Sequence, residues 1–150
     1  MRLDVRDERV QELLQAWGVP YSYGAGKPAD GARDDWFIGV NGIRGGVGYD
    51  CSGFVQVAQV RLGLLSPAAA DASVGGLWEK SDLVRDQPRI GDMAFYGKER
   101  PTHVMLCLGG GVVMGATGGY PTTNADMPTA YVSLQRLPYW TQLLCVRRLR

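Results

Sequence analysis

Two side chains in this sequence have the chemistry of a nucleophile and its base. Cys51 follows Asp50 at the start of a predicted helix, and His103 is the only histidine among the 150 residues. A thiol attacks as its thiolate, and a helix N-terminus or a nearby imidazolium can lower its pKa from about 8.5 to between about 3.5 and 7.5. An imidazole titrates near neutrality and suits a general base. These residue types predict nucleophilic catalysis, with N–H groups of the first helical turn as oxyanion donors.

Each of these residues also has a purely structural explanation. A lone cysteine is commonly a small core residue, and a lone histidine at a strand end is commonly a satisfied polar residue. Cys107 and Cys145 lie within apolar strand patterns and are expected in the core. Three cysteines at unrelated spacings argue against a disulfide framework and against a zinc site. The acidic residues between positions 30 and 35 lack the spacing of a calcium loop, so we expect no metal and no other cofactor.

Helices are predicted in the first half of the chain. Apolar residues recur at helical spacing over residues 7–17, and Gly18 ends that pattern. Asp50 can cap a second helix over residues 51–62, with Gly63 as its stop. A third helix or a pair of turns is predicted between residues 68 and 84. Residues 24–48 have no sustained period and are predicted to form a long loop, of a kind that often serves as a lid or binding segment.

Strands are predicted in the second half, where the apolar period changes to two. They cover residues 93–95, 103–108, 112–116, 131–137 and 143–149, with Gly109–Gly111 as a hairpin turn. Helices followed by strands predict one α+β domain over residues 1–150, with N-terminal helices packed on an antiparallel sheet. Such a fold places Cys51 at the mouth of a central helix and His103 at the start of a strand.

Charge and hydropathy exclude several classes of partner. The formal net charge is +1, so the chain lacks the basic field that nucleic acid or an anionic membrane calls for. No run approaches the roughly 18 apolar residues of a membrane span, and the first residues lack the apolar stretch of a signal peptide. We therefore expect no nucleic acid partner, no membrane insertion and no export by the general secretory route. Arg147, Arg148 and Arg150 are expected on a solvated terminal strand rather than in a binding patch.

Four motifs follow one another in this sequence, within about residues 7–116. They are GVPYSYG at 18–24, YDCSGFV at 49–55, RIGDMAF at 89–95 and HVMLCLG at 103–109. In the same order, they resemble the segments G-x-P-Y-x-x-G, DCSGxV, PGDLVFF and HVGIYLG of the NlpC/P60 cysteine peptidases. The resemblance implies a papain-like α+β fold, a thioester intermediate on Cys51 and proton transfer through His103. Substrates in that family are peptidoglycan stem peptides, commonly cut beside D-glutamate.

The resemblance also implies roles for three residues near the nucleophile. Tyr21 would line the cleft, and Asp50 and Ser52 would help to recognise the amine or backbone of the substrate. Simpler explanations remain open for two of them, because Asp50 can be a helix cap alone and Tyr21 can be a core aromatic.

The sequence departs from the family pattern where a third polar residue usually orients the imidazole. That position, twelve residues after the base, is Gly115 here. If Gly109–Gly111 form a three-residue loop, Thr117 lies opposite His103, and its hydroxyl could accept the Nδ1 proton. Water, a backbone carbonyl or Asn124 are the alternatives.

The resemblance favours a thiol endopeptidase or amidase acting on peptidoglycan, and two alternatives remain. One is a CHAP-type thiol amidase, against which the DCSGF segment and the strand motifs count. The other is a non-catalytic virion or scaffold protein with a vestigial site, suggested by Gly115. No export signal or wall-binding domain is recognised, and residues 115–119 look like those of phage-associated members. We therefore expect a protein made in the cytoplasm that acts on the cell wall, as a bacteriophage or prophage product released with a holin or carried in a virion tail.

Overall fold

The computed structural model describes residues 2–19, 49–116, 131–138 and 142–150. Within these ranges the chain forms three α-helices, one 3-10 turn and a six-stranded antiparallel sheet. The predicted α+β class is thus confirmed. None of the helices described is long and apolar enough to cross a bilayer. The elements are α1 (Glu8–Leu14), α2 (Cys51–Arg61), η1 (Pro67–Ala69), α3 (Val74–Glu79), β1 (Ser81–Leu83), β2 (Met93–Tyr96), β3 (His103–Gly109), β4 (Val112–Ala116), β5 (Val132–Arg136) and β6 (Leu143–Leu149).

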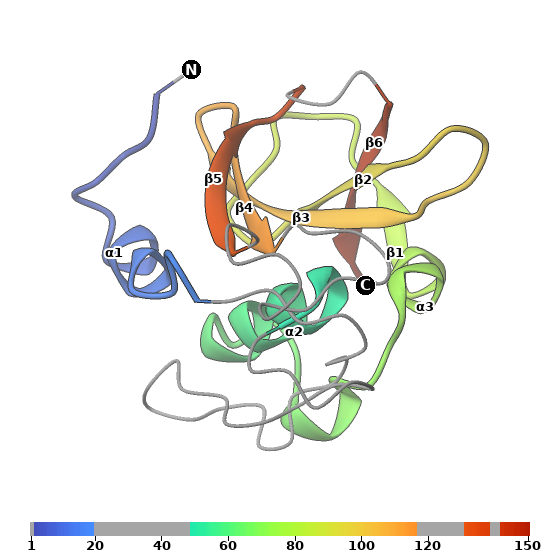
Figure 1. The fold of residues 1–150 in the computed structure, drawn as a ribbon, viewed down its shortest axis with the longest axis horizontal. Helices are drawn as coiled ribbons and strands as arrows, with labels where there is room; N and C mark the ends of the chain where they lie inside the picture. The colour runs from blue at the N-terminus through green and yellow to red at the C-terminus, as the bar shows by residue number, and fades with distance from the viewer. Residues whose placement is uncertain (1, 20–48, 117–130, 139–141) are drawn as a thin grey trace.

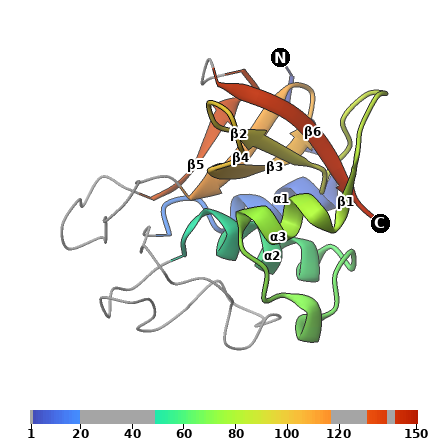
Figure 2. The same cartoon turned by 90° about the vertical axis from the view of Figure 1, so that its right-hand side faces the viewer.

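The helices lie together on one side of the sheet (Figure 2). The strand order is β1-β6-β2-β3-β4-β5, and α2 packs against the central strands β3 and β4. Helix α3 lies by β1, and α1 lies toward β5 (Figure 1). The main core fills the space between these two layers, so the helix that begins at Cys51 is fixed against the strand that begins at His103.

Helix α2 is buried along most of its length rather than on one face. Every residue over positions 52–59 is buried, which is typical of a central helix. The Asp50 side chain caps it by accepting a hydrogen bond from the N–H of Gly53 at 2.7 Å. At the other end Gly63 adopts φ +74° and donates to the carbonyl of Val60, which ends the helix as predicted. The beginning and end of α2 are therefore both determined by local sequence.

The opposite face of the sheet also buries side chains. Among the described residues, those gathered on this face come from strands or from the segment that follows β5. Cys107 is buried here, which confirms its predicted core position, whereas Cys145 is only half-buried. The cluster consists of Ala94, Tyr96, Met105, Cys107 and Val113, with Leu137, Leu143 and Val146 packed against it.

The structure differs from the predicted elements in three places. Helix α1 ends at Leu14, and Trp17, which was expected to extend the apolar face, is 55% exposed. Strand β1 was not predicted, because three residues show no measurable period and its partner β6 lies more than sixty residues away. Finally, β6 lies inside the sheet between β1 and β2, and Arg147 and Arg148 are half-buried and bind other residues of the chain, whereas Arg150 is exposed as expected.

Candidate active site

The candidate nucleophile lies where α2 meets the start of β3. Cys51 is the first residue of α2, and its sulfur is approached by hydrogen-bonding backbone N–H groups of Val104, Ser52 and Cys51 itself. The N–H of Val104 belongs to the peptide group that joins it to His103. The fold therefore brings the thiol of one motif to the strand end that carries the histidine of another.

The electrostatic surroundings of Cys51 oppose ionisation of its thiol. Burial raises the pKa of Cys51 to about 12, and the neighbouring Asp50 carboxylate adds to the rise, while the backbone N–H groups act against it. The residue as a whole is half-buried, but its sulfur is enclosed, so burial has the largest effect. The prediction that the helix N-terminus lowers this pKa is therefore wrong for the structure described, because burial and the capping carboxylate outweigh the helix dipole.

His103 lies at the same strand end, in contact with an aromatic side chain. It is the first residue of β3, its backbone pairs with that of Tyr96 on β2, and the two ring centroids are 5.9 Å apart. Burial lowers the pKa of His103 to about 4. The thiol and the imidazole both favour their neutral forms, so the resting pair described is neutral rather than a thiolate and an imidazolium.

Strand alternation assigns the two candidate groups to different sides of β3. Val104 belongs to the main core, against which Cys51 packs, whereas Tyr96 and Met105, the neighbours of His103, belong to the cluster on the opposite face. Because His103 is the first residue of its strand, its side chain stands at the strand end, where no earlier strand residue separates the two faces. Any encounter between the two groups therefore takes place around the end of β3.

The position expected for an orienting side chain is filled by another residue. A Cβ atom added at Gly115 would lie 2.4 Å from the Sδ atom of Met105, so this methionine occupies the space. Leu106 pairs with Met114 in the predicted register, but Gly109 belongs to β3 and pairs with Val112 after a register shift, so the predicted three-residue loop over Gly109–Gly111 is wrong. Thr117 and Asn124 lie outside the described residues, and so do Tyr21 and the segment over residues 24–48. Their predicted roles stay predictions.

The other two candidate recognition residues form the cap of α2. The Oδ1 atom of Asp50 accepts hydrogen bonds from the N–H of Gly53 at 2.7 Å and from the hydroxyl of Ser52 at 3.4 Å. The structural explanation for Asp50 is thus confirmed, and Ser52 is buried beside it. Contacts of either residue with a substrate stay predictions.

A buried glutamine that sequence reasoning missed ties α2 to the segment before α3. Gln56 is fully buried, and its side-chain amide both donates to the carbonyl of Ala72 and accepts from its N–H, each at 2.8 Å. The same amide donates to the carbonyl of Ser52 at 2.9 Å. The signal available in the sequence was a polar residue inside a helix that otherwise reads as core.

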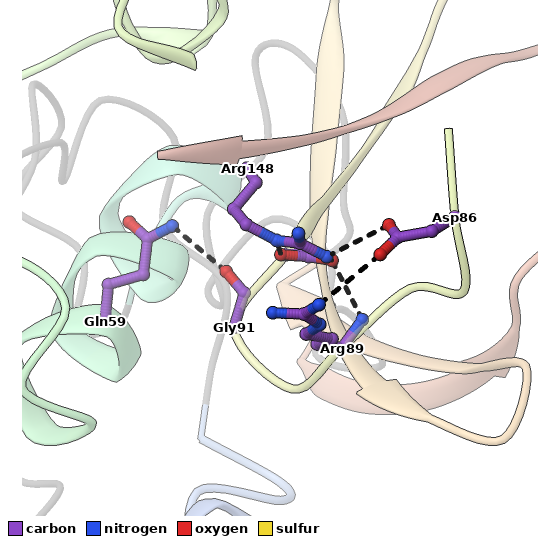
Figure 3. Close-up of polar contacts among 6 residues, drawn as sticks. Gln59, Asp86, Arg89, Gly91 and Arg148 are labelled. Atoms are coloured by element: carbon purple, nitrogen blue, oxygen red, sulfur yellow. Dashed lines mark hydrogen bonds and ion pairs between the residues drawn. The ribbon is translucent and has the colours of Figure 1, made fainter. Parts of the chain in front are cut away.

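The carboxylate of the third motif serves the structure rather than the candidate site. Asp92 is 2% exposed and accepts two hydrogen bonds from the Arg148 guanidinium, both at 2.8 Å, and one from the N–H of Arg89. Figure 3 shows Arg148 and Arg89 side by side, both directed toward Asp86. The bidentate pair of Asp92 and Arg148 gives both energy and a fixed geometry. The interaction joins the turn before β2 to β6.

Two of the surface hollows are lined by described residues alone, and neither of these two contains Cys51 or His103. One, of about 470 Å³, lies along residues 82–86 and the end of β6. The other, of about 390 Å³, lies between residues 64–69 and the chain end. Within the described ranges, no group of three or more His, Cys, Asp or Glu residues is placed to hold a metal ion.

Sequence comparisons match residues 18–148 to the NlpC/P60 family. Peptidoglycan endopeptidase RipA of Mycolicibacterium smegmatis is 32% identical over 129 residues, which make up 85% of this chain and 23% of the relative. Peptidoglycan endopeptidase RipB of Mycobacterium tuberculosis is 34% identical over 102 residues, 67% of this chain and 39% of the relative. The chain thus spans well under half the length of these curated relatives.

Solved structures agree with the sequence comparisons. The peptidoglycan hydrolase RipB of M. tuberculosis superposes with a TM-score of 0.61 at 24% identity, over 95% of this chain and 62% of that one, which shows a common fold. RipD of the same organism superposes with a TM-score of 0.58 at 28% identity over 99% and 98% of the two chains. RipD is described as a non-catalytic NlpC/p60 domain protein adapted to peptidoglycan binding. Fold, motif order and the family match over residues 18–148 lead to one conclusion: this chain belongs to the NlpC/P60 family.

Proposed function

We propose that this chain hydrolyses amide bonds in peptidoglycan stem peptides, with Cys51 as nucleophile and His103 as base. The observation that carries the proposal is that Cys51, the first residue of α2, lies by the start of β3, where the backbone N–H of Val104, the residue that follows His103, acts to lower the pKa of the Cys51 thiol. The family match and the relatives named peptidoglycan endopeptidases support the substrate class, and they favour this reading over a CHAP-type amidase.

The neutral resting pair suggests how the reaction begins. The imidazole of His103 takes the thiol proton as the Cys51 sulfur forms a bond to the carbonyl carbon, so charge appears only at attack. The tetrahedral intermediate then collapses, the C–N bond breaks, and the amine leaves with the proton from the imidazolium. Water then attacks the thioester carbonyl and gives a proton to the imidazole. The C–S bond breaks, the product leaves as a carboxylic acid, and the imidazolium returns the proton to the Cys51 sulfur.

Stabilisation of the oxyanion is assigned to backbone donors that already lie at the sulfur. The N–H groups of Cys51 and Ser52 are within reach of the thiol, whereas the N–H of Gly53 is bound to the capping Asp50. Pre-oriented donors at a helix N-terminus are well suited to a negative charge that develops during attack. Asp50 thus binds the N–H of Gly53, and the N–H groups of Cys51 and Ser52 are assigned to the substrate oxygen.

The proposal requires the imidazole to reach the sulfur around the start of β3. His103 therefore has to turn an edge toward Cys51 while its other side stays against Tyr96. Thr117 remains our candidate acceptor for the Nδ1 proton, and Tyr21, Asp50 and Ser52 remain candidates for substrate recognition. Unchanged turnover in Thr117→Val would remove the first of these roles.

Digestion of purified murein, followed by mass analysis of the released peptides, tests the reaction and identifies the bond. We expect peptide release by the wild type, and losses of at least about 10³-fold for Cys51→Ala and for His103→Gln. Cys107→Ala is the matched control, because Cys107 is a buried thiol on the opposite face of the sheet. Full activity of folded Cys51→Ala would falsify the mechanism.

A second candidate is peptidoglycan binding without cleavage, as described for RipD. The absence of a side chain at Gly115 and the preference of Cys51 and His103 for their neutral forms favour it. Co-sedimentation with insoluble murein separates the two candidates. Sedimentation of a wild type that releases no peptide supports binding alone, and release of defined peptides supports the enzyme.

Origin and location stay proposals. We propose that the chain acts at a bacterial cell wall, and a bacteriophage or prophage source with partners in a virion tail stays a prediction. The same holds for the expected single-domain organisation and for the expected absence of cofactors, nucleic acid partners and membrane insertion.

A further inference from the structure

A tyrosine on the neighbouring strand lies directly opposite the proposed base. Tyr96 is the last residue of β2, and its backbone is paired with that of His103. The ring centroids are 5.9 Å apart, and the ring planes are inclined by 43°. Directly paired cross-strand side chains interact, and aromatic rings at this separation are in the favourable range. The contact lies at the strand end where the Cys51 sulfur meets the N–H of Val104.

Tyr96 is itself held firmly in one place. Its side chain is 0% exposed, and its hydroxyl donates a hydrogen bond of 2.6 Å to the carbonyl of Leu137, just beyond β5. Its backbone pairs with β3 on one side and with Leu143 of β6 on the other. Any change of rotamer would break the buried hydrogen bond and open a void, so the ring offers a rigid surface to its neighbour.

Two further described positions on the same face provide no rigid ring. Gly115 has no side chain, and Met105, which occupies the space beside it, presents a flexible thioether. The anchored ring of Tyr96 is therefore a rigid neighbour of His103. It also keeps water from one side of the imidazole, in agreement with the lowering of the His103 pKa by burial.

We propose that Tyr96 is a positioning residue for His103: its ring, anchored through Leu137, fixes one side of the imidazole so that an edge of the imidazole can face Cys51. The inference rests on the proposed function, in which His103 exchanges a proton with the thiol. Tyr96 takes no part in proton transfer. Its hydroxyl donates to the Leu137 carbonyl and so anchors the ring, and the ring packs against the imidazole.

Two variants separate the ring from the hydroxyl, and a third controls for lost packing. Tyr96→Phe keeps the ring, and we expect kcat within about two-fold of the wild type. Tyr96→Leu removes the ring, and we expect kcat to fall about ten-fold or more with KM within two-fold, because a misplaced group slows the chemical step. Phe95→Leu makes the same change one residue earlier, on the face against Trp78, and we expect it to leave kcat within about three-fold.

Nuclear magnetic resonance of the imidazole gives a readout independent of activity, since the chain contains a single histidine. We expect Overhauser contacts between the ring protons of His103 and Tyr96 in the wild type, and an increase of about one unit or more in the His103 pKa in Tyr96→Leu alone. Absence of those contacts overturns the inference, even if Tyr96→Leu does not fold. So does an unchanged kcat in folded Tyr96→Leu, or an equal loss in Phe95→Leu. A wild type that keeps the contacts but cleaves no murein contradicts the proposed function instead.

Discussion

Buried polar groups lie near both ends of β2, but their electrostatic surroundings differ. At the start of the strand, Asp92 is buried as part of a matched ion pair with Arg148. At its end, Tyr96 and His103 are in ring contact, and burial shifts Cys51 and His103 toward their neutral forms. A satisfied charge pair fixes geometry, whereas two neutral groups that can exchange a proton are suited to a reaction. The comparison separates the part of the motifs that builds the fold from the part proposed to react.

Removing the charge of Asp92 is expected to have the largest effect on stability. Asp92→Asn leaves the Arg148 guanidinium without its carboxylate, and we expect a loss of about 2–3 kcal/mol in the free energy of unfolding. The loss is below that of a fully buried pair because the Arg148 side chain is 34% exposed. Denaturant titration measures it, and alkylation of Cys51 by iodoacetamide should keep its wild-type rate.

Asp86→Asn is the matched control for that variant. Asp86 approaches the same guanidinium at 3.5 Å, but its side chain is 57% exposed. Exposed pairs contribute little, so a loss of no more than about 0.5 kcal/mol is expected. Equal losses in the two variants would contradict the structural role of the buried pair.

Burial of His103 predicts that the free energy of unfolding depends on pH between about pH 4 and 6.5. The pKa of His103 is about 4 in the folded chain, against 6.5 for the ordinary side chain. The unfolded chain therefore binds more protons between these values, and the contribution of His103 to stability is complete above pH 6.5 and is lost as pH falls to 4. We expect the wild type to lose about 1–3 kcal/mol more than His103→Gln over that range. Parallel stability curves for the two proteins would contradict the burial of this imidazole.

Two glutamines on α2 sharpen the comparison on a smaller scale. Gln56 makes three hydrogen bonds of normal length, whereas Gln59 makes one, of 3.5 Å to the carbonyl of Gly91, and its Oε1 has no partner among the described residues (Figure 3). Gln56→Met is expected to destabilise the fold by about 1–2 kcal/mol, and Gln59→Met by less than about 0.5 kcal/mol. Thermal unfolding measures both, and a reversed order would show that the bonds of Gln56 contribute little.

Much of the fold could be predicted from the sequence because its signals are local. Asp50 and Gly63 determine the beginning and end of α2, and alternation of apolar residues defines β3 and β4. Strand β1 escaped prediction because its three residues are stabilised by pairing with distant β6. The same reason explains the arginines of β6, whose partners Asp92 and Trp78 are remote in sequence.

The sequence indicated which residues form the candidate site, but it did not indicate how deeply they are buried or what surrounds them. The motifs around Cys51 and His103 indicated both groups, and the fold brings α2 to the start of β3. The direction of the Cys51 pKa was predicted wrongly, because burial of the sulfur depends on tertiary packing that no local pattern contains. The contact between Tyr96 and His103 likewise depends on the register between β2 and β3.

The most direct test of proton exchange between Cys51 and His103 is alkylation of Cys51 as a function of pH, followed by peptide mass mapping. If the imidazole takes the thiol proton, iodoacetamide should modify Cys51 at pH 7 at least about ten-fold faster in the wild type than in His103→Gln. The two rates should converge at high pH, and half-buried Cys145 should react alike in both proteins. Equal rates for Cys51 across the whole range would show that the imidazole does not act on the thiol, and would contradict the proposed mechanism.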